Sequence, residues 1–181
     1  MEKTSEDTPV LVEQDRRRFL QLAALGAGAS LLATTSWVPE ARAAGETEAL
    51  LLTCMDFRLM DEIERYMTYR GLRNKYDHMI LAGASLGALT ERYPAWNKTF
   101  WQHLEISIQL HHIHRVILLD HRDCGAYKTF LGDSHTETPE REAETHAKYL
   151  KELARQIRMK QPELEVETLL MDLKGEVEAV G

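Results

Sequence analysis

The two cysteines of the chain each lie in a short cluster of residues that can bind a metal ion. Cys54 is followed closely by Asp56 and Arg58. Cys124 comes three residues after His121. Two thiolates and one imidazole form a ligand set that suits Zn²⁺, and the Asp56 carboxylate or a water molecule could take the fourth position. A closed ligand set is typical of a structural zinc, and a water ligand of a catalytic zinc.

Alternating apolar runs and amphipathic patterns surround these clusters. Apolar runs predict buried strands, and apolar residues at helical spacing between charges predict surface helices. We expect strands at 49–53, 78–82, 115–120 and 166–173, a hairpin strand at 177–180, and helices at 60–69, 100–112 and 142–160. The segment 83–87 is expected to be a turn, and Pro94 to lie in a loop.

This alternation predicts an α/β fold, a mostly parallel sheet of four to five strands with helices on both faces. Functional residues in such sheets collect at the carboxyl ends of the strands. Cys54 follows the first predicted strand and His121 follows the third. We therefore expect the two ligand clusters to meet at one edge of the sheet.

Composition limits the kind of protein. The chain has 181 residues, of which 44% are hydrophobic and 28% charged, which is typical of a globular domain with a core of its own. The formal net charge is −7, and Lys and Arg do not cluster beyond the N-terminus. A nucleic-acid partner is therefore not expected.

The first 43 residues resemble a twin-arginine export signal. Arg16, Arg17 and Arg18 precede a stretch rich in Ala, Gly and Leu, and the segment 41–43 has the small-x-small pattern of a cleavage site. This pattern predicts contact with the export machinery, a periplasmic or otherwise exported location, and a single mature domain at 44–181. Retention of the segment as a membrane anchor is the alternative.

Export leaves a disulfide between the two cysteines as an alternative to a metal site, because disulfides form in oxidising compartments. A disulfide would need neither the Asp and Arg that follow Cys54 nor the His that precedes Cys124. These neighbours favour the metal site.

The two clusters together resemble the motifs of the β-class carbonic anhydrases. Cys54-x-Asp56-x-Arg58 follows a first strand, and His121-x-x-Cys124-Gly follows a later one. The two-part pattern is far more specific than either half alone. Similarity in the order of the elements extends over residues 50–173.

The resemblance implies a function and roles for these residues. Cys54, His121 and Cys124 would hold one zinc ion per chain, and a zinc-bound hydroxide would convert carbon dioxide reversibly to bicarbonate. Asp56 and Arg58 would be the catalytic gatekeeping pair: Asp56 either closes the zinc site or pairs with Arg58 and leaves a position for water. The resemblance also implies a homodimer or higher homo-oligomer.

Other positions depart from the family pattern. Leu-Ala-Gly-Ala at 81–84 stands where the family usually has Arg-Asn-Ala-Gly, and Phe57 stands where a small residue is common. A diverged zinc hydrolase of carbonyl sulfide or carbon disulfide is therefore an alternative, as is a non-catalytic exported domain stabilised by zinc or a disulfide. Asp120 is expected to orient a ligand by a hydrogen bond to its imidazole.

A third class of function is a serine hydrolase. The segment 83–87 has the Gly-x-Ser-x-Gly frame of a nucleophile elbow, with Ser85 as the nucleophile. His121 or His146, with Asp172, could complete a triad. This hypothesis leaves Cys54 and its neighbours unexplained, so it ranks below the zinc site.

Overall fold

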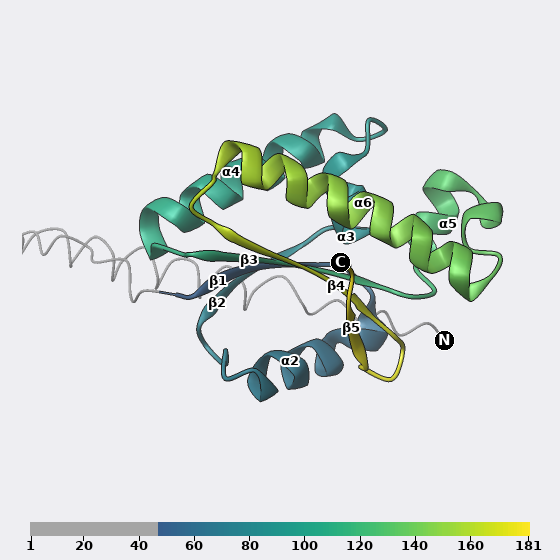
Figure 1. Cartoon of the computed structure of the whole chain (residues 1–181), viewed down its shortest axis with the longest axis horizontal. Coiled ribbons are helices and arrows are strands. Elements are labelled where there is room, and N and C mark those ends of the chain that lie inside the picture. Colours follow the sequence, from purple (N-terminus) through teal and green to yellow (C-terminus); the bar gives the residue numbers. More distant parts are fainter. Residues whose placement is uncertain (1–46) are drawn as a thin grey trace, which may run out of the picture. The chain divides into compact units, whose positions relative to one another are not determined.

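The computed structural model describes residues 47–181. The predicted export signal at residues 1–43 lies outside the described residues, so the signal and the domain boundary after it stay predictions (Figure 1).

The described chain is built on one five-stranded sheet. The strands are β1 (Ala49–Thr53), β2 (Tyr76–Ile80), β3 (Arg115–His121), β4 (Glu165–Met171) and β5 (Val177–Ala179). Their order across the sheet is β2-β1-β3-β4-β5. The first four strands pair in parallel, and β5 returns antiparallel to β4. The prediction of a mostly parallel α/β sheet is confirmed.

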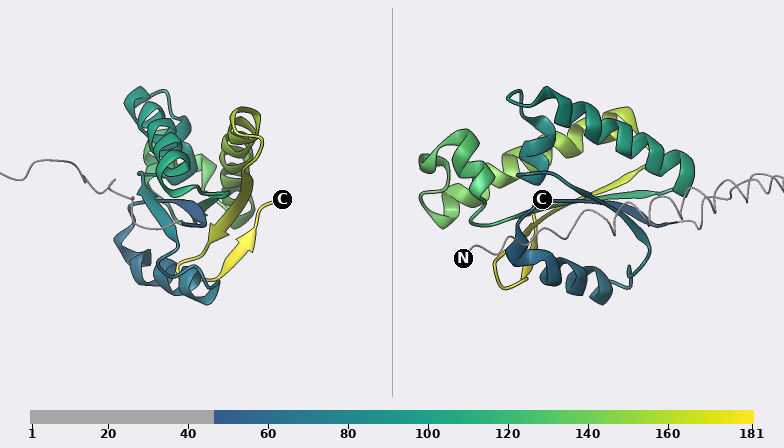
Figure 2. Two further views of the ribbon diagram at one scale, coloured as in Figure 1. Left: turned by 90° about the vertical axis from the view of Figure 1, so that its left-hand side faces the viewer. Right: turned by 180° about the vertical axis from the view of Figure 1, so that it is seen from behind.

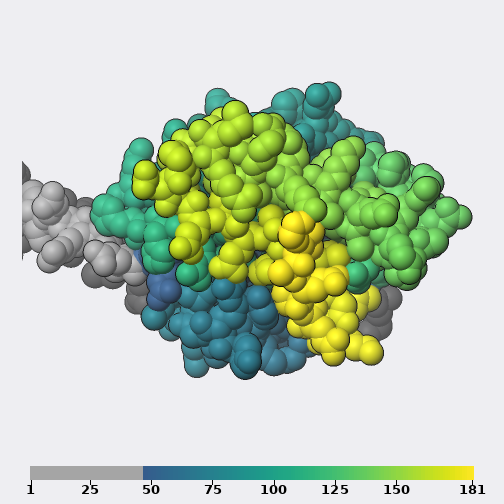
Figure 3. Space-filling model, viewed as in Figure 1, coloured from purple at the N-terminus to yellow at the C-terminus, as the bar shows by residue number. Residues whose placement is uncertain are grey.

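Helices cover both faces of the sheet. Helix α2 (Met60–Tyr69) lies on one face, and α3 (Ala84–Leu89), α4 (Pro94–His111) and α6 (Pro139–Lys160) lie on the other (Figures 1 and 2). Helix α5 (Gly125–Leu131) follows β3, and single 3-10 turns occupy Phe57–Leu59 and Asp133–His135. In the space-filling view, the yellow C-terminal segment lies on the surface between α6 and the blue α2 region (Figure 3).

The central strands are apolar throughout because both of their faces are covered. All five residues of β1 are buried, as are the last six of β3. Alternate residues enter two separate cores. Leu50 and Leu118 pack with α3, α4 and α6, whereas Leu51 and Ile117 pack with α2.

Two predicted elements agree with the structure residue for residue, namely the strand at 49–53 and the helix at 60–69. The prediction of a loop at Pro94 was wrong, because Pro94 is the first residue of α4, a position where its missing N–H costs nothing. The prediction of a turn at 83–87 was also wrong beyond Gly83, since helix α3 begins at Ala84. Helix α5 was not predicted, because seven residues are too few for a clear helical period.

None of the helices in the part of the chain that the structure describes is long and apolar enough to span a membrane.

We expect alanine at Gly87 to destabilise the fold. A Cβ atom there would lie 2.4 Å from the carbonyl oxygen of Ala82, so the backbone at the start of α3 would have to move. Overpacking of this kind costs about 1–3 kcal/mol in the free energy of unfolding, which urea denaturation would measure. Gly125→Ala is the matched control, because its Cβ would meet nothing within 4 Å. Equal stability of the two variants would contradict the prediction.

Candidate metal centre

Two neighbouring parallel strands bring the predicted ligands together. Cys54 directly follows β1, His121 is the last residue of β3, and Cys124 immediately precedes α5. The ligand atoms of these three residues all lie within 4.8 Å of one another. The Sγ atoms of Cys54 and Cys124 are 3.8 Å apart, and both cysteines are free.

The cluster is buried and has an unused donor atom. Cys54 is 6% exposed, His121 4% and Cys124 1%. The Nδ1 atom of His121 lies 2.8 Å from the carbonyl oxygen of Arg122, which favours a proton on Nδ1 and a free lone pair on Nε2. Nε2 is buried and has no hydrogen-bond partner within residues 47–181. Two thiols and an imidazole with a free lone pair fit a single zinc ion.

The surroundings concentrate negative charge on one sulfur. The pKa of Cys54 is lowered, chiefly because the Cys124 thiol donates to it, and also because His121 and the Gly83 N–H stabilise the thiolate. The pKa of Cys124 is raised by the same hydrogen bond and by burial. The pKa of His121 is raised: burial lowers it, but the neighbouring Cys54 outweighs burial. Zinc binding would therefore displace a proton from Cys124.

The carboxylate of Asp56 is held beside this cluster by Arg58. Arg58 donates from Nε to Oδ1 at 2.9 Å and from Nη2 to Oδ2 at 2.7 Å, and this fork lowers the pKa of Asp56 to about 2. The Oδ2 atom lies 3.7 Å from Nε2 of His121. Asp56 is therefore ionised at neutral pH and close to the ligand cluster while bound to Arg58.

Asp123 lies beside Asp56 and Arg58 and forms an ion pair with Arg58. Its Oδ2 accepts from Nη1 of Arg58 at 2.9 Å, and its backbone oxygen accepts from Nη2 at 3.1 Å. Lys128 also pairs with the Asp123 carboxylate. Arg58 is thus fixed from two sides, between the loop after β1 and the loop after β3. In the sequence, the signal for Asp123 is its position between His121 and Cys124.

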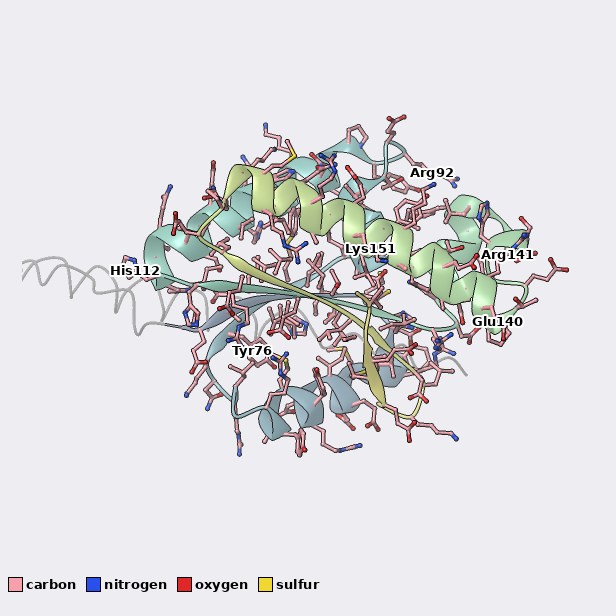
Figure 4. All side chains as sticks on the ribbon, viewed as in Figure 1. Tyr76, Arg92, His112, Glu140, Arg141 and Lys151 are labelled. Carbon is pink, nitrogen blue, oxygen red and sulfur yellow. The ribbon has the colours of Figure 1, made fainter. Side chains whose placement is uncertain are left out.

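A cavity of about 740 Å³ opens next to Cys54. Its wall includes Tyr93, Trp96 and Phe130, whose rings pack together, with 4.4 Å between the ring centres of Tyr93 and Trp96. Arg92, labelled in Figure 4, lies 5.6 Å from the centre of the Phe130 ring. Ala82 also lines the cavity, so the departure from Arg-Asn-Ala-Gly makes this wall more apolar.

The family described as "Putative carbonic anhydrase" matches residues 44–181. The chain belongs to this family. An uncharacterised protein of Rickettsia bellii is 42% identical over 135 residues, covering 75% of this chain and 82% of the relative. An uncharacterised protein of Rickettsia conorii is 42% identical over 135 residues, covering 75% of this chain and 73% of the relative.

Solved structures support the same fold for this carbonic-anhydrase-family chain. The carbonic anhydrase of Streptococcus mutans matches with a TM-score of 0.53 at 20% identity, over 91% of this chain and 97% of that one. The β-carbonic anhydrase CafD of Aspergillus fumigatus matches with a TM-score of 0.53 at 11% identity, over 82% of this chain and 95% of that one. At these identities the likeness shows the fold alone.

Two expectations about this family member were wrong. Asp120 does not bond to the imidazole of His121, because neighbouring residues of a strand point to opposite faces of the sheet. Ser85 is not placed as a nucleophile: it is 0% exposed, and its hydroxyl donates to Asp120. Asp172 accepts backbone bonds within the β4–β5 turn and is no part of a triad with Ser85.

The free thiols lead to a prediction about oxidation. The sulfurs of Cys54 and Cys124 are adjacent, so mild oxidation of this chain without bound metal should join them in a disulfide. Added Zn²⁺ should prevent this by occupying both thiolates. Titration of free thiols would measure the loss of the two thiols on oxidation. The chain has two cysteines, so every thiol that is lost belongs to this pair. Oxidation at the same rate with and without zinc would contradict a shared site.

Proposed function

We propose that the chain catalyses the reversible hydration of carbon dioxide to bicarbonate with one zinc ion per chain. The observation that carries this proposal is the buried convergence of Cys54, His121 and Cys124 beside a carboxylate held by arginine. Membership of the carbonic anhydrase family supports it.

Cys54, His121 and Cys124 would hold the metal. A bound zinc lowers the pKa of water from near 15.7 to about 7 and so makes hydroxide available at neutral pH. Asp56, ionised and next to His121, can accept a hydrogen bond from the attacking oxygen and direct its lone pair to the carbon. Carbon dioxide and water give bicarbonate and one proton.

Arg58 would keep Asp56 available for this role. Its two parallel hydrogen bonds occupy both carboxylate oxygens, so they oppose a shift of Asp56 onto the metal. Asp123 and Lys128 extend the charge pairing and limit the movement of Arg58. The open form of the site is thereby favoured.

Hydrolysis of carbonyl sulfide or carbon disulfide is a second candidate. These molecules are less polar than bicarbonate, and the aromatic wall with Ala82 in place of a polar residue suits them. Attack of water on the carbon would convert carbonyl sulfide and one water to carbon dioxide and hydrogen sulfide, and carbon disulfide and two waters to carbon dioxide and two molecules of hydrogen sulfide.

We further propose a homo-oligomer. Phe57 is 85% exposed and Met55 65%, and both line the cavity next to Cys54. Burial of these side chains by a second copy would remove apolar surface from water. Sedimentation of the purified protein would reveal the oligomeric state.

We also propose that residues 1–43 direct export through the twin-arginine machinery and are then removed, which places the mature protein in the periplasm or outside the cell. Sequencing the N-terminus of the exported protein would test this proposal.

The main proposal is tested on the full chain purified without chelator. We expect about one zinc per chain and hydration of carbon dioxide that a strong chelator removes and added zinc restores. Zinc without hydration, combined with sulfide release from carbonyl sulfide, would favour the second candidate. A chain that takes up no zinc would contradict both candidates and leave a non-catalytic domain.

A further inference from the structure

Four polar side chains form a cluster on the face of the sheet that carries α3 and α6. Ser85, Asp120, Tyr127 and His146 are each at most 1% exposed. Asp120 lies at the centre. None of the four side chains is a candidate metal ligand. Asp120 directly precedes His121, Tyr127 comes three residues after Cys124, and Ser85 comes two residues after Gly83, whose N–H contacts Cys54.

The Asp120 carboxylate accepts hydrogen bonds on both oxygens. Its Oδ1 accepts from the Ser85 N–H at 3.0 Å. Its Oδ2 accepts from the Ser85 hydroxyl at 2.6 Å and from the Tyr127 hydroxyl at 2.5 Å, and lies 2.9 Å from Nδ1 of His146. Burial raises the pKa of Tyr127 well above its usual value, so the phenol stays a donor.

The first of these bonds lies next to the turn that contacts Cys54. Gly83, two residues before Ser85, donates its N–H to the Cys54 sulfur at 3.3 Å. The turn has a left-handed backbone, with φ of 78° at Gly83 and 40° at Ala84, and an alanine rarely adopts such a value. The N–H of Ser85, the next residue, donates to Asp120.

The bond from Tyr127 lies near the other sulfur, that of Cys124. Tyr127 lies three residues after Cys124, in the first turn of α5. Its hydroxyl ties that turn to the end of β3, where Asp120 directly precedes His121. His146 fixes the same carboxylate to the long helix α6. The Asp120 carboxylate thus connects three segments: the turn at Gly83, which donates to Cys54, the start of α5 next to Cys124, and the end of β3 with His121.

We propose that Asp120 is a positioning residue of the metal centre, which presets the separation of the two cysteine sulfurs by restraining the Gly83 turn and the first turn of α5. This inference rests on the zinc binding proposed above. Asp120 does not touch the reacting atoms. A carboxylate suits this position because it accepts on both oxygens and donates nothing. Asparagine would turn one oxygen into an NH₂ group that faces the donors of Ser85 or Tyr127.

The test is the affinity of the full chain for Zn²⁺, measured by competition with a chelator, together with the absorption spectrum of the Co²⁺ form. For Asp120→Asn we expect affinity to fall roughly 10–100-fold and the thiolate-to-cobalt bands to shift, since altered support displaces the sulfurs. Ile157→Val is the matched control: it trims a fully buried side chain of α6, about 16 Å along the helix from His146. This control should keep the wild-type affinity and spectrum.

A second variant covers the case in which Asp120→Asn does not fold. Tyr127→Phe removes a single hydroxyl and leaves Ser85 on Asp120, so we expect a smaller loss of affinity with a shifted Co²⁺ spectrum. Wild-type affinity and spectrum in the folded Asp120→Asn variant, or in Tyr127→Phe if the first does not fold, would overturn the inference alone. Absence of metal binding in the wild-type chain would overturn the proposed function and this inference with it.

Discussion

Replacing Cys124 with serine is expected to abolish zinc binding and reduce carbon dioxide hydration to the uncatalysed rate. A serine hydroxyl stays protonated near neutral pH and is a poor zinc ligand, whereas a thiolate is a strong one. The sulfur lies 3.8 Å from that of Cys54, in a cluster too buried for water to replace the lost ligand easily. Zinc per chain and the rate of hydration would measure the effect.

Cys54→Ser is the companion variant, and it should lose zinc equally. Circular dichroism of both variants would separate the loss of metal from the loss of fold. Retention of one zinc per chain by either folded variant would contradict a site built on both cysteines. In the wild-type chain, the raised pKa of Cys124 means that zinc competes with a proton there, so zinc affinity should fall as the pH falls.

Replacing Arg58 with alanine is expected to lower hydration roughly 10–100-fold while zinc stays bound. The variant loses the fork that holds both oxygens of Asp56, whose Oδ2 already lies 3.7 Å from Nε2 of His121. Without Arg58, the carboxylate is free to reach the metal and close the site. Hydration kinetics and the zinc content of the same sample would measure the two effects separately.

Arg58→Lys is the matched control, because it keeps the positive charge and loses the two parallel bonds. We expect its rate to lie between those of the wild type and Arg58→Ala. Binding of a small anion to the Co²⁺ form should weaken in Arg58→Ala if Asp56 occupies the free position. Wild-type hydration in Arg58→Ala would show that Asp56 needs no restraint.

The convergence of Cys54, His121 and Cys124 could be predicted from the sequence because its signals are local. The run before Cys54 and the run that ends at His121 are apolar enough to predict central strands, and parallel strands end at one edge of a sheet. The approach of Cys54 to Cys124 follows from those two facts. By contrast, α5 is too short to show a clear helical spacing of its apolar residues. Pro94 was assigned to a loop, although proline is common at the start of a helix.

The sequence by itself determined the types of the candidate ligands and the succession of strands and helices along the chain, since each depends on residues close together in the chain. The order of the strands across the sheet and the choice of Arg58 as the partner of Asp56 came from the structure. Only the tertiary structure decided the partners of Asp123 and Asp120. Arg58 bonds to Asp123, which is 65 positions away in the chain. Asp120 forms hydrogen bonds with Ser85 and His146, which belong to two different helices. Such contacts depend on which helix covers which face of the sheet, and no local pattern carries that information.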